Sequence, residues 1–254
     1  MLLPHNYHSH TARCGHAIGE DREYVESAIQ AGMQTLGFSD HTPYPFENGY
    51  RSSIRMDCRE IEDYTSSILR LRDEYKKDIR ILLGVEAEYY PLFFKAWQKL
   101  VADYPFDYFI LGQHCIGNEI EGDYSGRPTL DPSRLTAYVD QVIEAMQTGV
   151  YLYLAHPDLL RYVPCRSRHY KAETRRLCEA AKAMSVPLEI NLLGIREHRW
   201  YPNSYFWQIV GEVGNDVVLG SDAHRPNDMY SEDAVKKAHK MIKKYGLHLI
   251  EKPL

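Results

Sequence analysis

The chain has 254 residues, of which 44% are hydrophobic and 26% charged, and its formal net charge is −5 at pH 7. The apolar fraction suffices for a folded core, and the acidic balance argues against nucleic acid as a partner, because phosphate backbones require a basic face. The five cysteines are scattered and include no Cys-x-x-Cys pair, which disfavours a disulfide framework. The sequence has no signal-peptide pattern and no apolar run that could span a bilayer, so we expect a cytoplasmic protein.

Short apolar runs alternate with longer amphipathic segments throughout the chain. Segment 57–76, for example, has Ile61, Tyr64, Ile68 and Leu71 at helical spacing, which is typical of a helix with one core-facing side. The predicted elements alternate in chain order: strand 2–8, helix 21–31, strand 35–39, helix 57–76, strand 79–86, helix 91–102, strand 108–113, helix 131–147, strand 151–155, helix 170–184, strand 187–190, helix 204–213, strand 217–220 and helix 231–244.

Cap residues mark the ends of two predicted helices. Asp131 and Ser231 are typical N-cap residues, and Gly149 and Gly246 follow these helices as stop signals. Seven β/α units without a linker or repeat predict one α/β domain over residues 1–254, built on a parallel sheet. Seven units favour a closed or nearly closed TIM-like barrel. A doubly wound open sheet is the alternative, although no Gly-x-Gly-x-x-Gly or Walker-type loop follows a predicted strand.

Two pairs of potential metal ligands lie near opposite ends of the chain. His8 and His10 are two residues apart, as are Asp222 and His224, and this spacing turns both side chains of an extended segment to the same side. Further metal-binding residue types lie at or near the C-terminal ends of predicted strands: His16, Asp40, His41, Glu86, His114 and His156. Because β/α barrels form their sites at this rim, we expect these side chains to meet and hold divalent cations, with a carboxylate bridging two ions.

Each of these residues taken singly also has a structural explanation. A strand-end histidine such as His114 or His156 is more often a hydrogen-bonded structural residue than a ligand, Glu86 could form a salt bridge, and Asp40 could cap a turn. The set as a whole favours metal binding, because five other histidines show no such placement: His5, His169, His198, His239 and His248.

The candidate residues lie in six motifs spread over nearly the whole chain: His8-Ser9-His10 with His16 downstream, Phe38-Ser39-Asp40-His41, Gly84-Val85-Glu86, Gln113-His114, Ala155-His156-Pro157 and Gly220-Ser221-Asp222-Ala223-His224. With these motifs the chain resembles the polymerase-and-histidinol-phosphatase (PHP) superfamily, in its stand-alone histidinol-phosphatase branch. Any one motif is weak, whereas their combination is highly specific. The resemblance implies a distorted (β/α)7 barrel with the metal site at the C-terminal ends of the strands.

The resemblance also implies how the ligands divide among up to three ions. The first ion would be held by His8, His10, Glu86 and Asp222. Glu86 would bridge to the second, which would also bind His114 and His156. The third would be held by His16, His41 and His224. Such ligands suit zinc, manganese and iron about equally, so we expect two or three ions of these kinds.

Three residues near these motifs, Asn6, Cys14 and Cys115, are not expected to bind metal themselves. Asn6 stands where the family often has an aspartate, and we expect it to form hydrogen bonds behind the ligands. Cys14 and Cys115 neighbour the motifs, and we expect them to pack beside the site, because the histidines already provide enough ligands.

The resemblance implies a metal-dependent phosphomonoesterase that hydrolyses L-histidinol phosphate to L-histidinol and phosphate, a reaction of histidine biosynthesis. Clustered divalent ions lower the pKa of bound water, so a metal-bound hydroxide can attack phosphorus directly. Glu86, Asp222 and His224 would serve catalysis through the metals. Asp40 is a candidate proton shuttle or, with better support, a group that orients a ligand.

The substrate is expected to be a small phosphorylated molecule, and neither nucleic acid nor a membrane is expected as a partner. Arginine suits the non-bridging oxygens of a phosphate, and Arg161 and Arg196 lie in predicted rim loops. The resemblance points to the same two residues. Glu88, Tyr44 and Tyr89 are possible contacts for the rest of the substrate, and a core or surface role has at least equal support for each.

Two alternatives to this function stay open. The first is a phosphoesterase that acts on another small phosphate ester or on a nucleotide. The second is a metal-binding or regulatory module without activity. The sequence does not indicate the oligomeric state.

Overall fold

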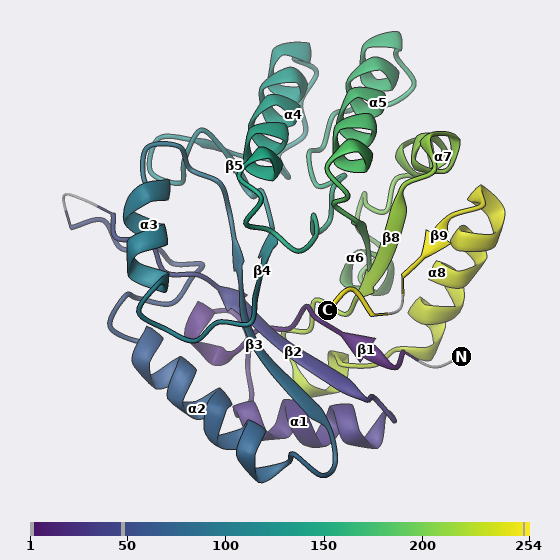
Figure 1. The fold of residues 1–254 in the computed structure, drawn as a ribbon. Coiled ribbons are helices and arrows are strands. Elements are labelled where there is room, and N and C mark those ends of the chain that lie inside the picture. The colour runs from purple at the N-terminus through teal and green to yellow at the C-terminus, as the bar shows by residue number, and fades with distance from the viewer. Residues whose placement is uncertain (1–2, 47–48, 251) are drawn as a thin grey trace.

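The computed structural model describes residues 3–46, 49–250 and 252–254, and its parallel strands are flanked by helices (Figure 1). The first sheet has four parallel strands in the order β1 (His5–Asn6), β2 (Thr35–His41), β3 (Arg80–Ala87) and β4 (Tyr108–Leu111). The second has three parallel strands in the order β7 (Leu188–Asn191), β8 (Asp216–Gly220) and β9 (His248–Leu249). All residues of β2 are buried, as expected for a parallel strand covered on both faces.

Single bridges link the two sheets. Leu154 pairs in parallel with Leu111 in the first sheet and with Leu188 in the second. Ser9, after β1, pairs with Ala223, after β8. The parallel sheet is therefore curled, and segments from the two ends of the chain lie side by side.

Helices cover the outside of the curled sheet (Figure 1). The α-helices assigned within the described ranges are α1 (Asp21–Gln30), α2 (Ile61–Glu74), α3 (Phe94–Val101), α4 (Pro132–Gln147), α5 (Arg168–Ala183), α6 (Leu192–Arg196), α7 (Ser204–Val213) and α8 (Glu232–Tyr245). Two short 3₁₀ helices are η1 (Ala12–Cys14) and η2 (Pro226–Asp228). In the part of the chain that the structure describes, no helix combines the length and apolar character needed to cross a bilayer.

The predicted helix caps are confirmed. The side chain of Asp131 accepts a hydrogen bond from the N–H of Ser133 at the start of α4. The side chain of Ser231 accepts one from the N–H of Ala234 at the start of α8. Gly149 and Gly246 have φ angles of 68° and 64°, in the left-handed region that favours glycine. These residues fix where the two helices begin and end.

Several predicted elements have different bounds in the structure. The predicted strand 2–8 is reduced to β1, and Leu2 lies outside the described residues. Instead of a strand at 151–155, only Leu154 forms bridges. The sequence analysis missed α6, which is too short to show helical periodicity, and three two-residue strands, β5 (Cys115–Ile116), β6 (Asp123–Tyr124) and β9.

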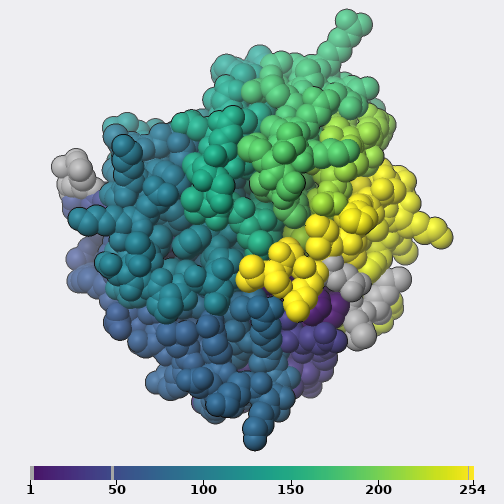
Figure 2. All heavy atoms as spheres, viewed as in Figure 1, coloured from purple at the N-terminus to yellow at the C-terminus, as the bar shows by residue number. Residues whose placement is uncertain are grey.

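The C-terminal residues contact the strands of the first sheet. The carbonyl oxygen of Leu254 accepts hydrogen bonds from the Tyr7 hydroxyl and from the Arg80 guanidinium, each at 3.3 Å. Figure 2 shows this yellow segment between the blue N-terminal part and the green part of the surface. The two ends of the chain thus help to hold the curled sheet together.

The space enclosed by the strands contains a separate apolar cluster with Tyr108 in it. The Tyr108 hydroxyl donates to the carbonyl oxygens of Tyr7, at 2.8 Å, and Phe38, at 3.0 Å. Its side chain lies close to the backbone of β2 and β3, because a Cβ atom added at Gly37 or Gly84 would come within 2.2 or 2.5 Å of Tyr108 atoms. Two glycines therefore make room for one buried tyrosine.

We expect Gly84→Ala to destabilise the protein by about 1–3 kcal/mol, because the added methyl group overlaps the Tyr108 ring and both are buried. Urea unfolding at equilibrium measures the change. Gln30→Ala, at an exposed position of α1, is the control and should change the free energy of unfolding by less than about 0.5 kcal/mol. A Gly84→Ala protein as stable as the parent would contradict this packing.

Candidate metal centre

The predicted ligands lie at the ends of the parallel strands, and their side chains converge. His41 is the last residue of β2, Glu86 lies one residue before the end of β3, and His156 follows the bridge that joins the two sheets. The centroid of the His10 ring lies 4.1 Å from that of His224 and 4.4 Å from that of His41. Side chains from both ends and the middle of the sequence thus share one site.

Glu86 lies at the centre of this group and is fully buried. Its Oε1 atom lies near two imidazoles: His156 at 2.8 Å and His114 at 3.7 Å. Its Oε2 atom lies near three more: His41 at 3.1 Å, His8 at 3.5 Å and His10 at 3.7 Å. Two ligand atoms that share a tetrahedral zinc ion, each about 2.1 Å from it, are roughly 3.4 Å apart. The spacing around Glu86 is therefore compatible with shared cations.

Asp222 contributes the second carboxylate. Its Oδ1 atom lies 3.1 Å from Nε2 of His10, 3.5 Å from Nε2 of His8 and 3.4 Å from Nδ1 of His224. Asp222 and His156 have φ angles of 47° and 28°. Non-glycine residues are held in this region only where the surrounding structure enforces it, often at functional sites.

A third group consists of His16, His41 and His224, whose ligand atoms lie within 4.8 Å of one another. The Nε2 atoms of His16 and His224 are 3.1 Å apart. Two neutral nitrogen lone pairs at this distance would repel each other, so a proton or a cation must lie between them. This group is the most exposed of the three, because His16 lies on the surface.

Buried polar atoms without a partner provide a test of whether these residues fit metal ions. Among the described residues, they include Nε2 of His8, Nε2 of His10 and Oε2 of Glu86. A buried polar atom without a hydrogen bond is costly, so such atoms are rare in folded proteins. Here they are nitrogen and carboxylate oxygen atoms that face one another, which is the donor set of zinc and other transition metals. The residues fit such ions.

The charges of the site also fit a cation. Burial disfavours ionisation of Glu86, but the imidazoles of His114, His41 and His8 lower its pKa well below the usual value. Burial also disfavours the charged ring of His10, but the nearby carboxylates of Asp222 and Asp40 raise its pKa to about 9. Without a metal, the carboxylates therefore favour a proton on His10, and a divalent cation would replace that proton.

Behind the candidate ligands, buried carboxylates accept hydrogen bonds from their second ring nitrogens. Nδ1 of His8 lies 2.7 Å from Oε1 of Glu189, and Nδ1 of His114 lies 2.9 Å from Oε1 of Glu88. Such contacts fix which nitrogen faces the metal and increase its basicity. The sequence analysis did not identify Glu189, although a charged residue inside the predicted buried strand 187–190 was a usable signal.

The PHP domain model matches residues 6–192, which is more than half of the chain and includes seven of the nine candidate ligands. The chain belongs to the PHP family. The family resemblance of the sequence motifs is thereby confirmed.

Relatives named histidinol-phosphatase align with this chain over most of their own length. A probable histidinol-phosphatase of Deinococcus radiodurans is 29% identical over 243 residues, which cover 91% of this chain and 90% of the relative. The histidinol-phosphatase of Bacillus subtilis is 29% identical over 254 residues, which cover 87% of this chain and 94% of the relative.

A solved structure shares its fold with this chain. It is the histidinol phosphate phosphatase of Lactococcus lactis in complex with zinc, L-histidinol and phosphate. It superposes with a TM-score of 0.75 at 22% identity, over 98% of this chain and 96% of that one. The α/β fold with a curled parallel sheet is thus the fold of this solved phosphatase.

Asn6, where PHP proteins often have an aspartate, joins the two ends of the chain. Its Oδ1 atom accepts a hydrogen bond from the N–H of Ser221 at 2.8 Å, and its Nδ2 donates to the carbonyl oxygen of His8 at 3.1 Å. An aspartate could accept from Ser221 but could not donate to His8. Asn6 therefore positions the backbone on both sides of the site.

A cavity of about 680 Å³ opens onto this site, and Glu86, His156 and Asp222 are among its lining residues. Acidic and basic side chains also line it: Glu119, Glu197, Asp228, Arg127, Arg199 and Arg225. A cavity of this size suits a small molecule. Its mixed charge suits a ligand that itself carries both signs of charge.

The two arginines expected to bind phosphate do not line this cavity. Arg161 is exposed, and its guanidinium lies over the Trp200 ring, 5.1 Å from the centroid, so its role as a phosphate binder stays a prediction. Arg196 lies next to the site: its Nη1 is 3.4 Å from the carbonyl oxygen of Ser221, and its buried Nη2 has no hydrogen-bond partner within the described chain. Arg196 thus has an unused donor close to Asp222.

Asp40 does not line the cavity either. It is fully buried, accepts hydrogen bonds from the Thr11 hydroxyl and the His41 N–H, and lies 3.4 Å from Nδ1 of His10. This burial gives less support to the proton-shuttle alternative. The orienting alternative agrees with this geometry.

The three possible contacts for the rest of the substrate have partners in the structure, in agreement with the alternative of a core role. Glu88 is buried and accepts hydrogen bonds from Arg55 at 2.8 and 2.9 Å, in addition to its contact with His114. The hydroxyl of Tyr44 donates to the carbonyl oxygen of Glu88, and that of Tyr89 donates to Glu144. All three side chains therefore serve the structure around the site.

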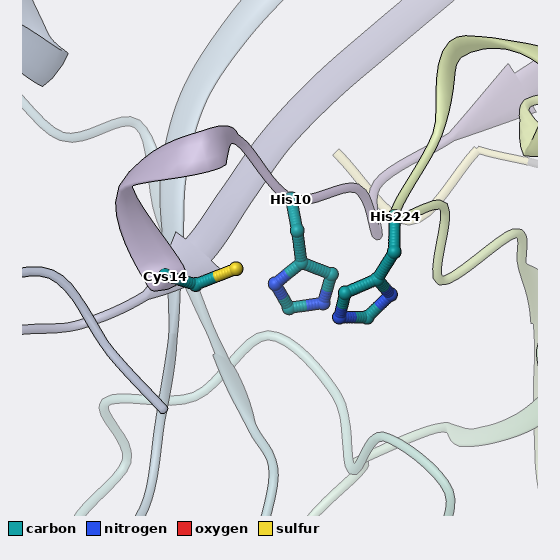
Figure 3. Close-up of side chains that lie close together, drawn as sticks. All are labelled: His10, Cys14 and His224. Atoms are coloured by element: carbon teal, nitrogen blue, oxygen red, sulfur yellow. The ribbon is translucent and has the colours of Figure 1, made fainter. Parts of the chain in front are cut away.

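Cys14 lies beside the site, as Figure 3 shows, with the His10 ring between its thiol and the His224 ring. One potential ligand atom from each of these residues lies within 4.8 Å of the others. Burial and the carboxylate of Asp40 raise the pKa of the Cys14 thiol. Because the carboxylates and imidazoles already provide enough ligands, packing beside the site stays the prediction for Cys14.

Proposed function

We propose that this PHP protein hydrolyses L-histidinol phosphate to L-histidinol and phosphate. The observation that carries the proposal is the set of five imidazoles within 3.7 Å of the carboxylate of Glu86, beside a cavity suited to a small charged molecule. The relatives named histidinol-phosphatase support this substrate, as does the related enzyme that binds zinc, L-histidinol and phosphate.

The proposal includes the finer features of the fold. We infer a distorted (β/α)7 barrel in a single domain over residues 1–254. The parallel bridges at Leu154 support this, since they supply a seventh strand position between β4 and β7, and the bridge between Ser9 and Ala223 supports closure. A cytoplasmic location stays a prediction.

We assign two or three divalent ions, of zinc, manganese or iron, to nine ligands: His8, His10, His16, His41, Glu86, His114, His156, Asp222 and His224. Such ions lower the pKa of a bound water and neutralise charge on phosphoryl oxygens. Glu86 holds the cluster together because its two oxygens face different imidazoles. Asp222 and His224 hold adjoining positions, and Asp40 orients the ring of His10.

Charged side chains of the chain can bind the two ends of the substrate. Arg196, with its free Nη2, and Arg225, which lines the cavity, are candidates for the phosphate oxygens. Glu197 and Asp228 line the same cavity and are candidates for the ammonium group of histidinol phosphate. This distribution favours a zwitterionic ester over a simple anionic one.

A second candidate function keeps the metals and changes the ester. Metal-dependent tyrosine phosphatases of Bacillus subtilis and Streptococcus pneumoniae share the fold at a TM-score of 0.54 and 15% identity. Their likeness concerns the fold alone. The acidic composition continues to argue against long nucleic acids.

A phosphate-release assay on the zinc- or manganese-loaded protein tests the proposal. The substrates are L-histidinol phosphate, nucleoside monophosphates, a phosphotyrosine peptide and a short DNA. We expect kcat/KM for histidinol phosphate to exceed the others by at least about 100-fold, since recognition of both charged ends contributes about 3 kcal/mol. Equal, slow rates on all four would reject histidinol phosphate as the substrate.

A further inference from the structure

Tyr201 is a buried residue of the cavity wall that none of the sequence motifs includes. Only 2% of its surface is exposed, yet it lines the cavity together with Glu86 and Asp222. The centroid of its ring lies 6.1 Å from that of His156, one of the candidate ligands. A tyrosine so placed can reach a molecule bound at the metal centre.

The hydroxyl group of Tyr201 is oriented by a charged neighbour. Nη1 of Arg199 donates a hydrogen bond to the Tyr201 oxygen at 3.1 Å, and Nε of Arg199 donates to Glu197 at 2.9 Å. A guanidinium can only donate, so the phenol acts as the acceptor in this contact and its own O–H remains able to donate. The positive charge also polarises the O–H bond, which strengthens a hydrogen bond to an anion.

The ring of Tyr201 is held in place by the chain that precedes it. A Cβ atom added at Gly194 would come within 2.5 Å of both Cδ2 and the carbonyl oxygen of Tyr201. Gly194 lies inside α6, where glycine is otherwise unfavourable, so its presence is explained by this close approach. The N–H of Arg199 donates to the carbonyl oxygen of Gly194 at 2.9 Å. The two residues that form the hydroxyl contact are therefore anchored to the same short helix.

We propose that Tyr201 binds the substrate by donating its O–H to a phosphoryl oxygen of the ester, with Arg199 as the residue that positions this hydroxyl. The assignment rests on the proposed function, because it places a phosphate ester at the metal centre. A neutral donor suits this place, since it stabilises the anion without repelling the neighbouring cations. A phosphoryl oxygen has more than one lone pair. It could therefore bind a metal ion and accept a hydrogen bond from Tyr201 at the same time.

Tyr201→Phe in the metal-loaded full chain removes the hydroxyl and leaves the ring. We expect its affinity for inorganic phosphate, measured by calorimetry and as competitive inhibition, to fall about 10-fold or more, as for a hydrogen bond to a charged group. The zinc content should not change. Tyr205→Phe is the control, because Tyr205 lies on α7 over Arg166 and does not line the cavity. It should bind phosphate as the parent does.

Arg199→Lys tests the positioning role, because lysine keeps the charge but not the planar fork. We expect a smaller loss of phosphate affinity than in Tyr201→Phe, and no additional loss when the two changes are combined. Parent-like phosphate affinity of Tyr201→Phe, or an equal loss in Tyr205→Phe, would overturn the proposal. A parent that binds phosphate but does not hydrolyse histidinol phosphate would overturn the proposed function alone, because phosphate affinity does not depend on which ester is the substrate.

Discussion

Glu86→Gln is expected to abolish phosphate release from histidinol phosphate, with a fall in kcat/KM on the order of 10³-fold or more, because several kcal/mol of metal-dependent stabilisation are lost. Both oxygens of Glu86 face imidazoles, and the side chain is fully buried. Glutamine replaces one ligand oxygen by an NH₂ group that cannot bind a cation. The charge that balances the cations is lost as well.

Metal content and folding must be measured together with activity in the Glu86→Gln protein. We expect fewer bound metal ions per chain than in the parent and a circular dichroism spectrum like that of the parent. Excess zinc should not restore activity, since the bridging carboxylate itself is missing. Glu144→Gln, on the exposed side of α4, is the matched control and should retain both metal and activity. A Glu86→Gln protein as active as the parent would place the active site elsewhere.

Glu189→Gln is expected to weaken zinc binding by about 10–100-fold, the usual effect of losing a group that orients a ligand. Oε1 of Glu189 contacts Nδ1 of His8 at 2.7 Å, and Oε2 accepts from the N–H of His156 at 3.0 Å and from Asn191 at 2.9 Å. All these partners are donors once His8 binds a metal through Nε2. The NH₂ group of glutamine would therefore face one of these N–H donors and could not accept a hydrogen bond from it.

Zinc competition with a chromophoric chelator measures the change in Glu189→Gln. Unlike the Glu86 variant, this protein keeps all nine candidate ligands, so saturating zinc should recover most of its activity. Glu212→Gln, on the exposed surface of α7, serves as the control. Zinc affinity equal to that of the parent would mean that Glu189 does not orient His8.

The sequence predicted much of the site because its residues follow strands. His41, Glu86 and His156 each come at the end of an apolar run, and parallel strands end at the same edge of the sheet. The two-residue spacing of Asp222 and His224 also predicted two side chains on the same side of an extended segment. Such local patterns determine where a side chain emerges.

The residues that the sequence did not predict depend on contacts between distant segments. Glu189 lies 181 positions from the histidine that it contacts, and Tyr201 acquires its role through Arg199 and a close approach to Gly194. Arg161 follows the His156 motif closely, but its guanidinium turns to Trp200. The direction of a long side chain in a loop depends on the residues around it in space. The spacing of residues in the sequence does not predict those neighbours.

Short elements were missed for a related reason. The helix α6 is five residues long, and its first turn is fixed by Asn191, whose side chain accepts from the N–H of Gly194. Five residues are too few for a periodic apolar pattern. The segment expected as strand 151–155 does form backbone hydrogen bonds with β4 and with the residues around β7. Its assigned bridges, however, lie only at Leu154.

The most direct test of the proposed metal centre is a zinc titration of the chelator-treated full chain, followed by elemental analysis after gel filtration. We predict two or three zinc ions retained per chain, and a marked reduction in the Glu86→Gln protein but not in Glu144→Gln. A parent chain that retains no metal, or that retains the same amount as Glu86→Gln, would contradict the assignment of Glu86 as the centre of a metal cluster.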